Sequence, residues 1–430
     1  MTAMAPPEHR DDEAWARGLD ERDPLRHTRD LFEVPAGPGG APSVYLVGNS
    51  LGAQPKAARA AVERELDDWA RLGVEGHFGA RTPWYSYHEV FRECGARLVG
   101  ARPGEVVMMN SLTVNLHLLL VSFYRPTAER YRILIEDAAF PSDSYVAQTQ
   151  AEFHGLDPAR AVLRARPRAG EQTLRTEDLV SLLESEGRSI AVVMLSGVNY
   201  FTGEWFDMER ITAAGRAAGC VVGWDLAHAA GNVPVRLHEW GADFAAWCSY
   251  KYLNAGPGAV AGCFVHERHG SDRTLRRFGG WWGNDPATRF AMGPEFVPRA
   301  GADGWQLSNP PILAMAPLRA SLEIFDRIGM AALREKSVRL TGYLEWLLTR
   351  PGTGGRGVGL LTPSDPARRG CQLSVRVPGG ARAVLRELGA RGIVCDMREP
   401  DVIRAAPVPL YTTFHDAWVF ARALREVVGV

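Results

Sequence analysis

Short apolar runs alternate with amphipathic segments through the middle of the chain, and this alternation constrains the fold more than any other sequence feature. Strands are expected at Arg132–Glu136, Ile190–Leu195, Cys220–Asp225, Phe244–Ser249 and Ala261–His266. Helices are expected at Lys56–Leu72, Val114–Tyr124, Glu177–Ser185 and Met208–Ala218. Strands separated by helices favour a mostly parallel sheet with helices on both faces. The sequence therefore predicts a large α/β domain.

The pattern changes after Asn309. A long helical stretch is expected over Ile312–Leu348, and a glycine-rich loop follows at Gly352–Gly359. Strands and helices of a compact α+β unit are expected at Gln372–Val377, at Ala381–Ala390, near Ile393, near Val402 and from His415 onward. We therefore divide the chain into an N-terminal segment packed on the small domain (1–45), a large α/β domain (46–310), and a linking helix with a small C-terminal domain (311–430).

Charge and hydropathy exclude several classes of partner. The chain has 49 basic and 50 acidic residues, so its formal net charge of -1 gives no field that attracts nucleic acid or an anionic membrane. Met1–Arg29 lacks the apolar stretch of a signal peptide, and apolar runs such as Leu116–Tyr124 are far shorter than the roughly 20 residues that cross a bilayer. We expect a soluble, cytoplasmic protein whose partners are small molecules or another copy of itself.

The six cysteines are scattered, without the close pairs that build zinc sites or redox motifs. We expect buried, reduced thiols and no metal site. The lysines are more informative, because arginine outnumbers lysine 46 to 3. Lys251 lies in the aromatic stretch Ser249–Tyr252, which is a poor place for a surface charge. We therefore ask which function at Lys251 requires a primary amine.

Asp225 closes an apolar strand 26 residues before Lys251, and His228 follows it closely. Each residue alone has an ordinary explanation, a helix cap for the aspartate and a surface charge for the lysine. Together, at strand ends where α/β sheets bind ligands, they fit pyridoxal phosphate. The amine would form a Schiff base with the cofactor, and the carboxylate would keep the pyridine nitrogen protonated.

Two further segments suit the same cofactor. Ser111–Thr113 begins a helix whose free N–H groups can bind a phosphate, although a plain helix cap explains the same residues equally well. Phe140 begins the tetrapeptide Phe140–Asp143, which follows an expected strand and is a candidate stacking loop with the Phe140 ring facing the cofactor, although the tetrapeptide could equally be a turn.

Long ordered segments resemble the kynureninase family, a branch of the fold-type I pyridoxal-phosphate enzymes related to aminotransferases. The resemblance spans nearly the whole chain. It rests on the segments Gly48–Gly52, Leu112–His117, Phe140–Asp143, Trp224–Ala229, Trp247–Gly256, Ser308–Ile312 and Ala406–Tyr411. The implied fold is a large domain like that of aspartate aminotransferase, with a mostly parallel seven-stranded sheet, plus a small C-terminal α+β domain.

The resemblance also implies roles for individual residues. Lys251 would be the Schiff-base lysine, with Asp225 at the pyridinium nitrogen and His228 near the ring oxygen. The remaining cofactor contacts implied by the family are Leu112, Thr113 and Tyr250 on the phosphate side, Phe140 as the stacking ring, and Ser142, Asp143 and Ser196 in the same pocket. Trp281 and Asn309 resemble residues that the second subunit of a homodimer contributes to a shared active site. Trp282 lies beside Trp281, and either tryptophan could make that contact.

The implied reaction is hydrolytic cleavage of the bond between the β and γ carbons of a kynurenine, which releases alanine and an anthranilate. Arg404 resembles the residue that binds the substrate carboxylate, and Ser50 is also expected on the substrate side. His77, paired with Asn309 near the aromatic ring, resembles the members that favour 3-hydroxykynurenine. Further ring substituents and the pathway stay open.

Three other functions are weighed. A cysteine desulfurase or an aminotransferase of the same fold would share the strand-end aspartate and lysine. The desulfurase needs a reactive cysteine on a mobile loop, whereas Cys371 and Cys395 lie in strand-like contexts. A cofactor-binding regulator without activity is the third alternative, but the sequence has neither a DNA-binding module nor a basic patch to support it.

Overall fold

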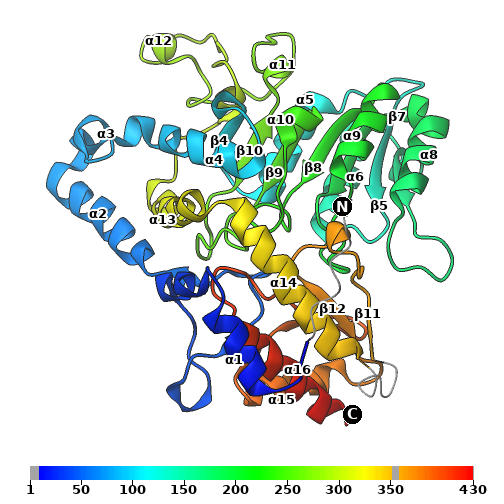
Figure 1. Ribbon diagram of the computed structural model, residues 1–430. Coiled ribbons are helices and arrows are strands. Elements are labelled where there is room, and N and C mark those ends of the chain that lie inside the picture. Colours follow the sequence, from blue (N-terminus) through cyan, green and yellow to red (C-terminus); the bar gives the residue numbers. More distant parts are fainter. Residues whose placement is uncertain (1–8, 351–357, 430) are drawn as a thin grey trace.

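A mostly parallel sheet lies at the centre of the larger of two lobes in the computed structural model, which describes residues 9–350 and 358–429 (Figure 1). Within these residues the sheet has seven strands in the order β4-β10-β9-β8-β7-β5-β6, and β10 is antiparallel to both of its neighbours. The strands are β4 (Val106–Met108), β5 (Arg132–Glu136), β6 (Val162–Ala165), β7 (Ile190–Ser196), β8 (Val221–Asp225), β9 (Phe244–Trp247) and β10 (Gly262–Val265). The α/β fold class predicted from the sequence is confirmed.

Helices cover both faces of this sheet because successive side chains of each strand point to opposite sides. In β5, Ile133 and Ile135 join one apolar core, whereas Leu134 joins the other. The helices of this lobe are α4 (Arg92–Val99), α5 (Leu112–Phe123), α6 (Pro141–Phe153), α7 (Pro158–Ala161), α8 (Thr176–Glu186), α9 (Met208–Ala217), α10 (Leu237–Trp240), α11 (Glu267–Gly270), α12 (Pro286–Arg289) and α13 (Ile312–Ile328).

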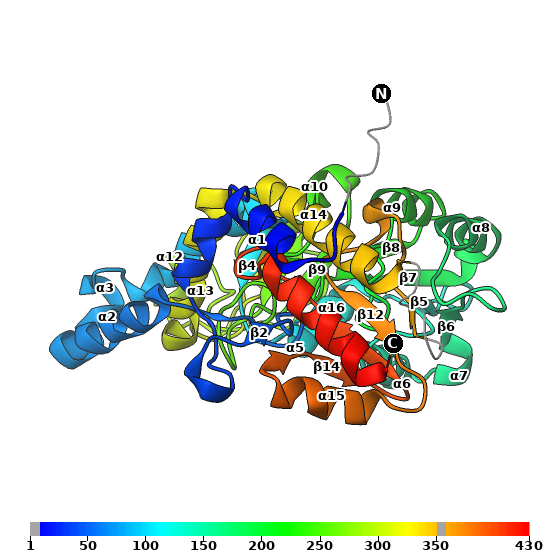
Figure 2. The ribbon, with the colours of Figure 1, turned by 60° about the horizontal axis from the view of Figure 1, so that its bottom comes forward.

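The smaller lobe is built on a four-stranded antiparallel sheet in the described residues, with the order β11-β12-β15-β14. The chain reaches it through α14, and α1 near the start of the chain packs on α16 near its end (Figures 1 and 2). The elements are α1 (Glu13–Glu21), α14 (Met330–Thr349), β11 (Gly359–Leu360), β12 (Leu373–Arg376), α15 (Ala381–Ala390), β13 (Ile393–Val394), β14 (Asp396–Arg398), β15 (Val402–Ala405) and α16 (Phe414–Val428). The division of the chain at residues 45 and 310 stays a prediction.

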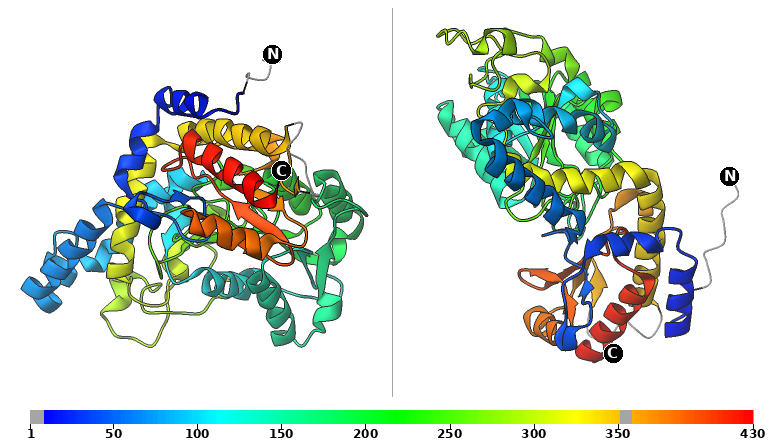
Figure 3. Two further views of the ribbon diagram at one scale, coloured as in Figure 1. Left: turned by 90° about the horizontal axis from the view of Figure 1, so that it is seen from below. Right: turned by 90° about the vertical axis from the view of Figure 1, so that its left-hand side faces the viewer.

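Two short strand pairs involve residues 32–55. β2 (Val44–Tyr45) pairs with β13, and β1 (Phe32–Glu33) pairs with β3 (Gln54–Pro55). From there α2 (Ala57–Leu72) and α3 (Gly76–Gly79) extend away from the body of the molecule (Figures 1 and 3). This arm exposes large apolar side chains, among them Trp69 and Phe78.

Two local expectations differ in detail from the structure. The stretch Ile312–Leu348 is not one helix, because Gly329 adopts φ 80° and separates α13 from α14. Phe140–Asp143 is not a separate loop, since Phe140 lies at the N-cap of α6 and Pro141 occupies its first turn, where a missing N–H costs nothing. Most of the predicted glycine-rich loop, Gly352–Gly359, lies outside the described residues. None of the described helices is long and apolar enough to cross a membrane.

Candidate active site

The carboxyl ends of β7, β8 and β9 border a cavity of about 310 Å³. Ligands of open α/β sheets collect at this edge. Both lobes contribute, because the small lobe supplies Arg398 and Arg404. The lining residues are Asn49, Ser50, Ser111, Leu112, Thr113, Phe140, Ser142, Asp143, Ser196, Val198, Tyr200, Asp225, Ala227, His228, Tyr250, Lys251, Arg398 and Arg404. The structure thus brings together every predicted site residue except His77, Trp281 and Asn309.

Lys251 lies half-buried in the turn that follows β9. Its Nζ is 3.0 Å from Nε2 of His228 and 5.7 Å from the centre of the Phe140 ring. The N–H of Gly52 donates to the carbonyl of Tyr250 at 2.8 Å and holds this turn. A Cβ at Gly52 would lie 2.3 Å from the carbonyl oxygen of Lys251, so only glycine permits the approach. The amine is therefore held in the cavity wall.

Two carboxyl groups in the cavity wall, those of Asp225 and Asp143, contact each other. Asp225 ends β8, and its Oδ1 accepts the N–H of Ala227 at 2.7 Å. Burial raises the pKa of Asp225, while that N–H and the charge of Lys251 oppose the rise. Burial raises the pKa of Asp143 well above its ordinary value, and the charge of Asp225 adds to this. Asp143 therefore keeps its proton and donates it to an ionised Asp225.

A third buried carboxyl group, that of Glu136, lies at the end of β5 and interacts with Asp225. Ser196 donates to Glu136 through its hydroxyl and, at 3.3 Å, through its backbone N–H. Burial raises the pKa of Glu136. Glu136 was not among the residues predicted from the sequence, although it ends an apolar strand just as Asp225 does.

His228 is buried, and its Nδ1 has no hydrogen-bond partner in the described part of the chain. Burial lowers the pKa of His228 well below its ordinary value, and the charges of Lys251 and Arg404 lower it further. The imidazole is therefore neutral, and Nε2 can accept a hydrogen bond from the ammonium group of Lys251. A buried nitrogen without a partner indicates a polar group that the chain itself does not supply.

The start of α5 also lines the cavity. Ser111 is the N-cap residue but makes no side-chain capping bond, and Leu112 and Thr113 follow it in the cavity wall. The first N–H groups of a helix have no partner inside that helix, and they attract anions. Asn110, just before the cap, has φ 49°, a conformation that asparagine tolerates better than most residues and that shapes this tight entry.

The small lobe closes the cavity with positive charge. Arg404 on β15 forms a two-pronged ion pair with Asp396 on β14, with Nε 2.7 Å from Oδ1. Arg398 lies two residues after Asp396 and lines the same cavity. The ring of Tyr200 meets Phe140 edge-on at 5.0 Å. Sequence reasoning missed Tyr200 and Arg398, because neither stands in a recognisable motif and only the packing of the two lobes brings them to this cavity.

Three predicted residues lie elsewhere on the same chain. His77 is on the protruding α3, where its ring meets Trp84 edge-on at 5.7 Å. Trp281 is 40% exposed, whereas Trp282 is buried, so of the two only Trp281 presents its ring to the surface. Asn309 lines a separate surface pocket.

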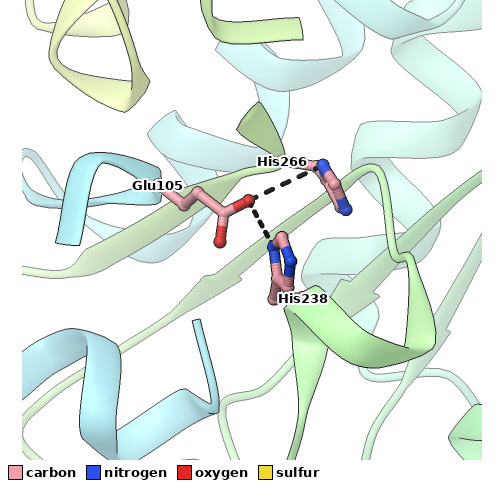
Figure 4. Close-up of side chains that lie close together, drawn as sticks. All are labelled: Glu105, His238 and His266. Carbon is pink, nitrogen blue, oxygen red and sulfur yellow. Dashed lines mark hydrogen bonds and ion pairs between the residues drawn. The ribbon is translucent and has the colours of Figure 1, made fainter. Parts of the chain in front are cut away.

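A second group of titratable side chains lies at the other edge of the sheet (Figure 4). Glu105 is buried, and its Oε1 lies 2.9 Å from Nδ1 of His238 and 3.6 Å from Nδ1 of His266. Its Oε1 also accepts the N–H of Glu267, and its Oε2 accepts the N–H of Arg102, both at 2.8 Å. Both carboxylate oxygens of Glu105 thus already accept hydrogen bonds from the protein, which favours a structural role for this group over metal binding.

The cavity fits pyridoxal phosphate in four respects. Within the described residues it has an amine at Lys251, a buried carboxyl group at Asp225, the N-terminus of α5 without a side-chain cap, and a ring nitrogen of His228 without a hydrogen-bond partner. These are the groups that a Schiff base, a pyridinium nitrogen, a phosphate and a ring oxygen would meet.

Comparison with known proteins assigns the family. The kynureninase of Salinispora tropica is 61% identical over 423 residues, which cover 97% of this chain and 98% of that protein. The kynureninases of Koribacter versatilis and Myxococcus xanthus are each 58% identical, over 95% and 96% of this chain and 96% and 97% of their own lengths. The chain belongs to the kynureninase family. This membership makes it a hydrolase of carbon–carbon bonds with pyridoxal phosphate as its cofactor, and the family model for the kynureninase C-terminal domain matches residues 333–424.

Solved structures place the fold among pyridoxal-phosphate enzymes. The cysteine desulfurase CsdA from Escherichia coli superposes with a TM-score of 0.74 at 20% identity, covering 93% of this chain and 98% of that one. A C-DES mutant with glycine covalently linked to its cofactor gives 0.73 at 20% identity, covering 92% and 98%. At these identities the likeness shows the fold alone. The two cysteines weighed for the desulfurase alternative, Cys371 and Cys395, are both buried, and burial raises the pKa of each to about 12, which disfavours a reactive thiolate at either position.

Proposed function

We propose that this protein cleaves the Cβ–Cγ bond of a kynurenine with water and releases L-alanine and the corresponding anthranilate. The observation that carries the proposal is the juxtaposition of Lys251, Asp225 and Arg404 around one cavity in a chain of the kynureninase family. Arg404 supplies a guanidinium for the substrate carboxylate, and the amine and the carboxylate suit the two ends of the cofactor ring.

Pyridoxal phosphate, once bound to an amino acid, supplies an electron sink for negative charge at the α carbon. Asp225 keeps a negative charge in the cavity wall, because Asp143 holds the shared proton, and a pyridinium nitrogen is stabilised by that charge. Lys251 acts as the base that removes the α proton when its amine is free. His228 is neutral and accepts a hydrogen bond from Lys251, so it orients the amine without competing for positive charge.

Hydrolysis adds water to the aryl ketone, and the Cβ–Cγ bond then breaks, leaving the anthranilate carboxylate and the three-carbon fragment of alanine. This step needs a proton at the departing carbon. Tyr250 lies beside Lys251, with its ring 6.0 Å from Nζ. Burial raises the pKa of Tyr250, so the phenol keeps its proton and can deliver it.

A homodimer completes the proposed site. Trp281 and Asn309 lie outside the cavity of their own chain, as does His77, and we propose that they act in the cavity of a second copy. Aromatic contacts link His77 to Trp84, and Phe78 through Tyr85 and Phe290 to Trp281, so the arm and the Trp281 segment form one surface. Exposed Phe278, Phe290 and Leu313 give that region an apolar character suited to a subunit interface.

His77 and Asn309 also carry a finer proposal on the substrate. Both side chains can form hydrogen bonds, and together they suit a kynurenine with a hydroxyl at ring position 3. We therefore propose 3-hydroxykynurenine as the preferred substrate, with a cytoplasmic location for the enzyme.

The test compares purified wild type with Lys251→Ala. We expect visible absorbance from lysine-bound cofactor and release of alanine from both kynurenine and 3-hydroxykynurenine, with the larger kcat/KM for the hydroxylated substrate. Lys251→Ala should lower kcat by about 10²-fold to 10⁴-fold or more, because it removes the proposed base, and should abolish that absorbance. Release of no alanine from either substrate would refute the proposed reaction, and an equal or larger kcat/KM for plain kynurenine would refute the role of His77 and Asn309.

A further inference from the structure

In the part of the chain that the structure describes, two guanidinium groups line the cavity from the small lobe, and they share one carboxylate, that of Asp396. The antiparallel register of β14 and β15 places Asp396 opposite Arg404 and Arg398 opposite Val402. Asp396 and Arg398 are two positions apart on one strand, so their side chains leave the sheet on the same face. The two arginines and the aspartate therefore carry one net positive charge at the cavity wall.

Asp396 already neutralises Arg404. The guanidinium donates from Nε and Nη2 to the two oxygens of Asp396 and from Nη1 to the carbonyl of Tyr200 at 2.8 Å. The Arg404 side chain is only 1% exposed, so water does little to weaken this pair. A substrate carboxylate that docks on Arg404 alone would meet the negative charge of Asp396 beside the positive charge that binds it. Two anions on one buried guanidinium are unfavourable without a second cation.

Arg398 supplies that second cation. Its Nη1 donates to the carbonyl of Met397 at 2.7 Å and lies 3.4 Å from Oδ2 of Asp396. In the described part of the chain, no hydrogen bond occupies its Nε or Nη2. Burial lowers the pKa of Arg398, and the neighbouring charge of Arg404 adds to that effect, as expected for a cation whose charge is incompletely balanced.

We propose that Arg398 binds the substrate α-carboxylate together with Arg404 and so makes the site selective for amino acids over amines. This inference rests on the proposed function and extends it by one specificity-determining residue. Arg404, held in place by its ion pair with Asp396, orients the substrate carboxylate. Arg398, whose side chain is 33% exposed, supplies the balancing charge at the cavity wall. Tyr200, whose carbonyl holds Arg404, keeps this pair next to Phe140.

The test uses cofactor-loaded protein and two small amines, L-alanine, which has a carboxylate, and ethylamine, which has none. Binding is followed by the change in visible absorbance of the cofactor. Arg398→Gln should weaken alanine binding about 10-fold or more and leave ethylamine binding within about twofold, because only the carboxylate contact is lost. Arg398→Lys, which keeps the charge but not the planar fork, should recover part of the loss.

Kinetics provide the second measurement. Arg398→Gln should raise the KM for kynurenine by a factor similar to the loss in alanine affinity and leave kcat within about threefold. Arg376→Gln is the matched control, because Arg376 lies in β12 of the same small sheet, outside the cavity, and pairs with Asp401. It should leave alanine binding, ethylamine binding and KM unchanged.

Three results would overturn the inference: unchanged alanine binding in Arg398→Gln, an equal loss for alanine and ethylamine, or the same loss in Arg376→Gln. Failure of the proposed function would look different. In that case wild type would not cleave kynurenine, yet the contrast between alanine and ethylamine in Arg398→Gln would still support a carboxylate contact at Arg398.

Discussion

Asp225 and Asp243 are both buried aspartates at the ends of neighbouring strands, yet their surroundings differ in kind. Asp225 lies at the carboxyl end of β8 and has one backbone donor, a second carboxyl group and Lys251 around it. Asp243 lies at the opposite edge, just before β9, where Arg268 and His269 bind its Oδ1 and the N–H of Val222 binds its Oδ2. Burial raises the pKa of Asp225, whereas these cations and hydrogen bonds outweigh burial and lower the pKa of Asp243.

The same contrast holds for the histidines. His228 at the cavity has a buried Nδ1 without a partner in the described residues, whereas His238 at the other edge is bound to Glu105. One edge of the sheet therefore holds polar groups whose hydrogen bonds and charges are left incomplete, which costs stability in the absence of a ligand. The other edge uses the same residue types to hold the fold together. Incomplete satisfaction of buried groups, rather than residue type, is what distinguishes the candidate active site.

Within this comparison of the two sheet edges, the largest effect is expected from removing the charge of each aspartate. Asp225→Asn should lower kcat by about 10²-fold to 10³-fold or more, because the charge that stabilises a pyridinium is lost. Asp243→Asn should leave kcat nearly unchanged but lower the free energy of unfolding by about 2–3 kcal/mol, because Arg268 and His269 lose their partner and both keep some contact with water. Steady-state kinetics and urea unfolding of the two variants measure these effects. A comparable loss of kcat in both variants would contradict the division between the two edges.

The pH dependence of stability should have opposite signs at the two sites in the cofactor-free protein. Because the folded chain raises the pKa of Asp225, ionisation costs stability as pH rises above the ordinary aspartate value of about 4. Asp225→Asn removes that cost, so its stability relative to wild type should increase as pH rises above about 4. The lowered pKa of Asp243 stabilises the folded chain above about pH 4, so the deficit of Asp243→Asn should shrink as pH falls below that value.

Thermal unfolding of wild type and both variants, at pH values on either side of about 4, tests whether the two pH dependences have opposite signs. If the Tm difference between Asp225→Asn and wild type does not change with pH, Asp225 does not carry an ionisation cost. Parallel curves for the two variants would show that the two edges are electrostatically alike.

The sequence predicted the long strands and the strand-end residues because both leave local signals. β5 lies at the expected residues, and Asp225 and Lys251 are marked by the apolar run and the aromatic stretch beside them. β4 was missed because three residues are too short for a periodicity to be recognised, and the break at Gly329 was missed because a single glycine is tolerated in many helices.

The small-lobe part of the cavity was harder to predict. Arg404 was identified only through the family resemblance, and Arg398 was not identified at all, because the chain has 46 arginines and sequence alone does not show which of them face a ligand. The hydrogen bond from Arg404 to the carbonyl of Tyr200 joins residues 204 positions apart, and it depends on how the two lobes pack. The roles of His77, Trp281 and Asn309 stay predictions, since they depend on a second copy of the chain.

The smallest expected effect concerns Glu105 at the structural edge. Glu105→Gln keeps one acceptor oxygen but places an amide N–H₂ group against donors from His238, Arg102 or Glu267, and it should lower the free energy of unfolding by about 1–2 kcal/mol, or Tm by a few degrees. Because the carboxylate already accepts hydrogen bonds from the protein, neither EDTA nor added zinc should shift the Tm of wild type. The kcat should not change, since this cluster lies at the sheet edge away from Lys251. A zinc-dependent rise in the Tm of wild type that Glu105→Gln abolishes would instead show that the cluster is a metal site. Both edges of the sheet would then bind a ligand, and the contrast between a ligand-binding edge and a structural edge would fail.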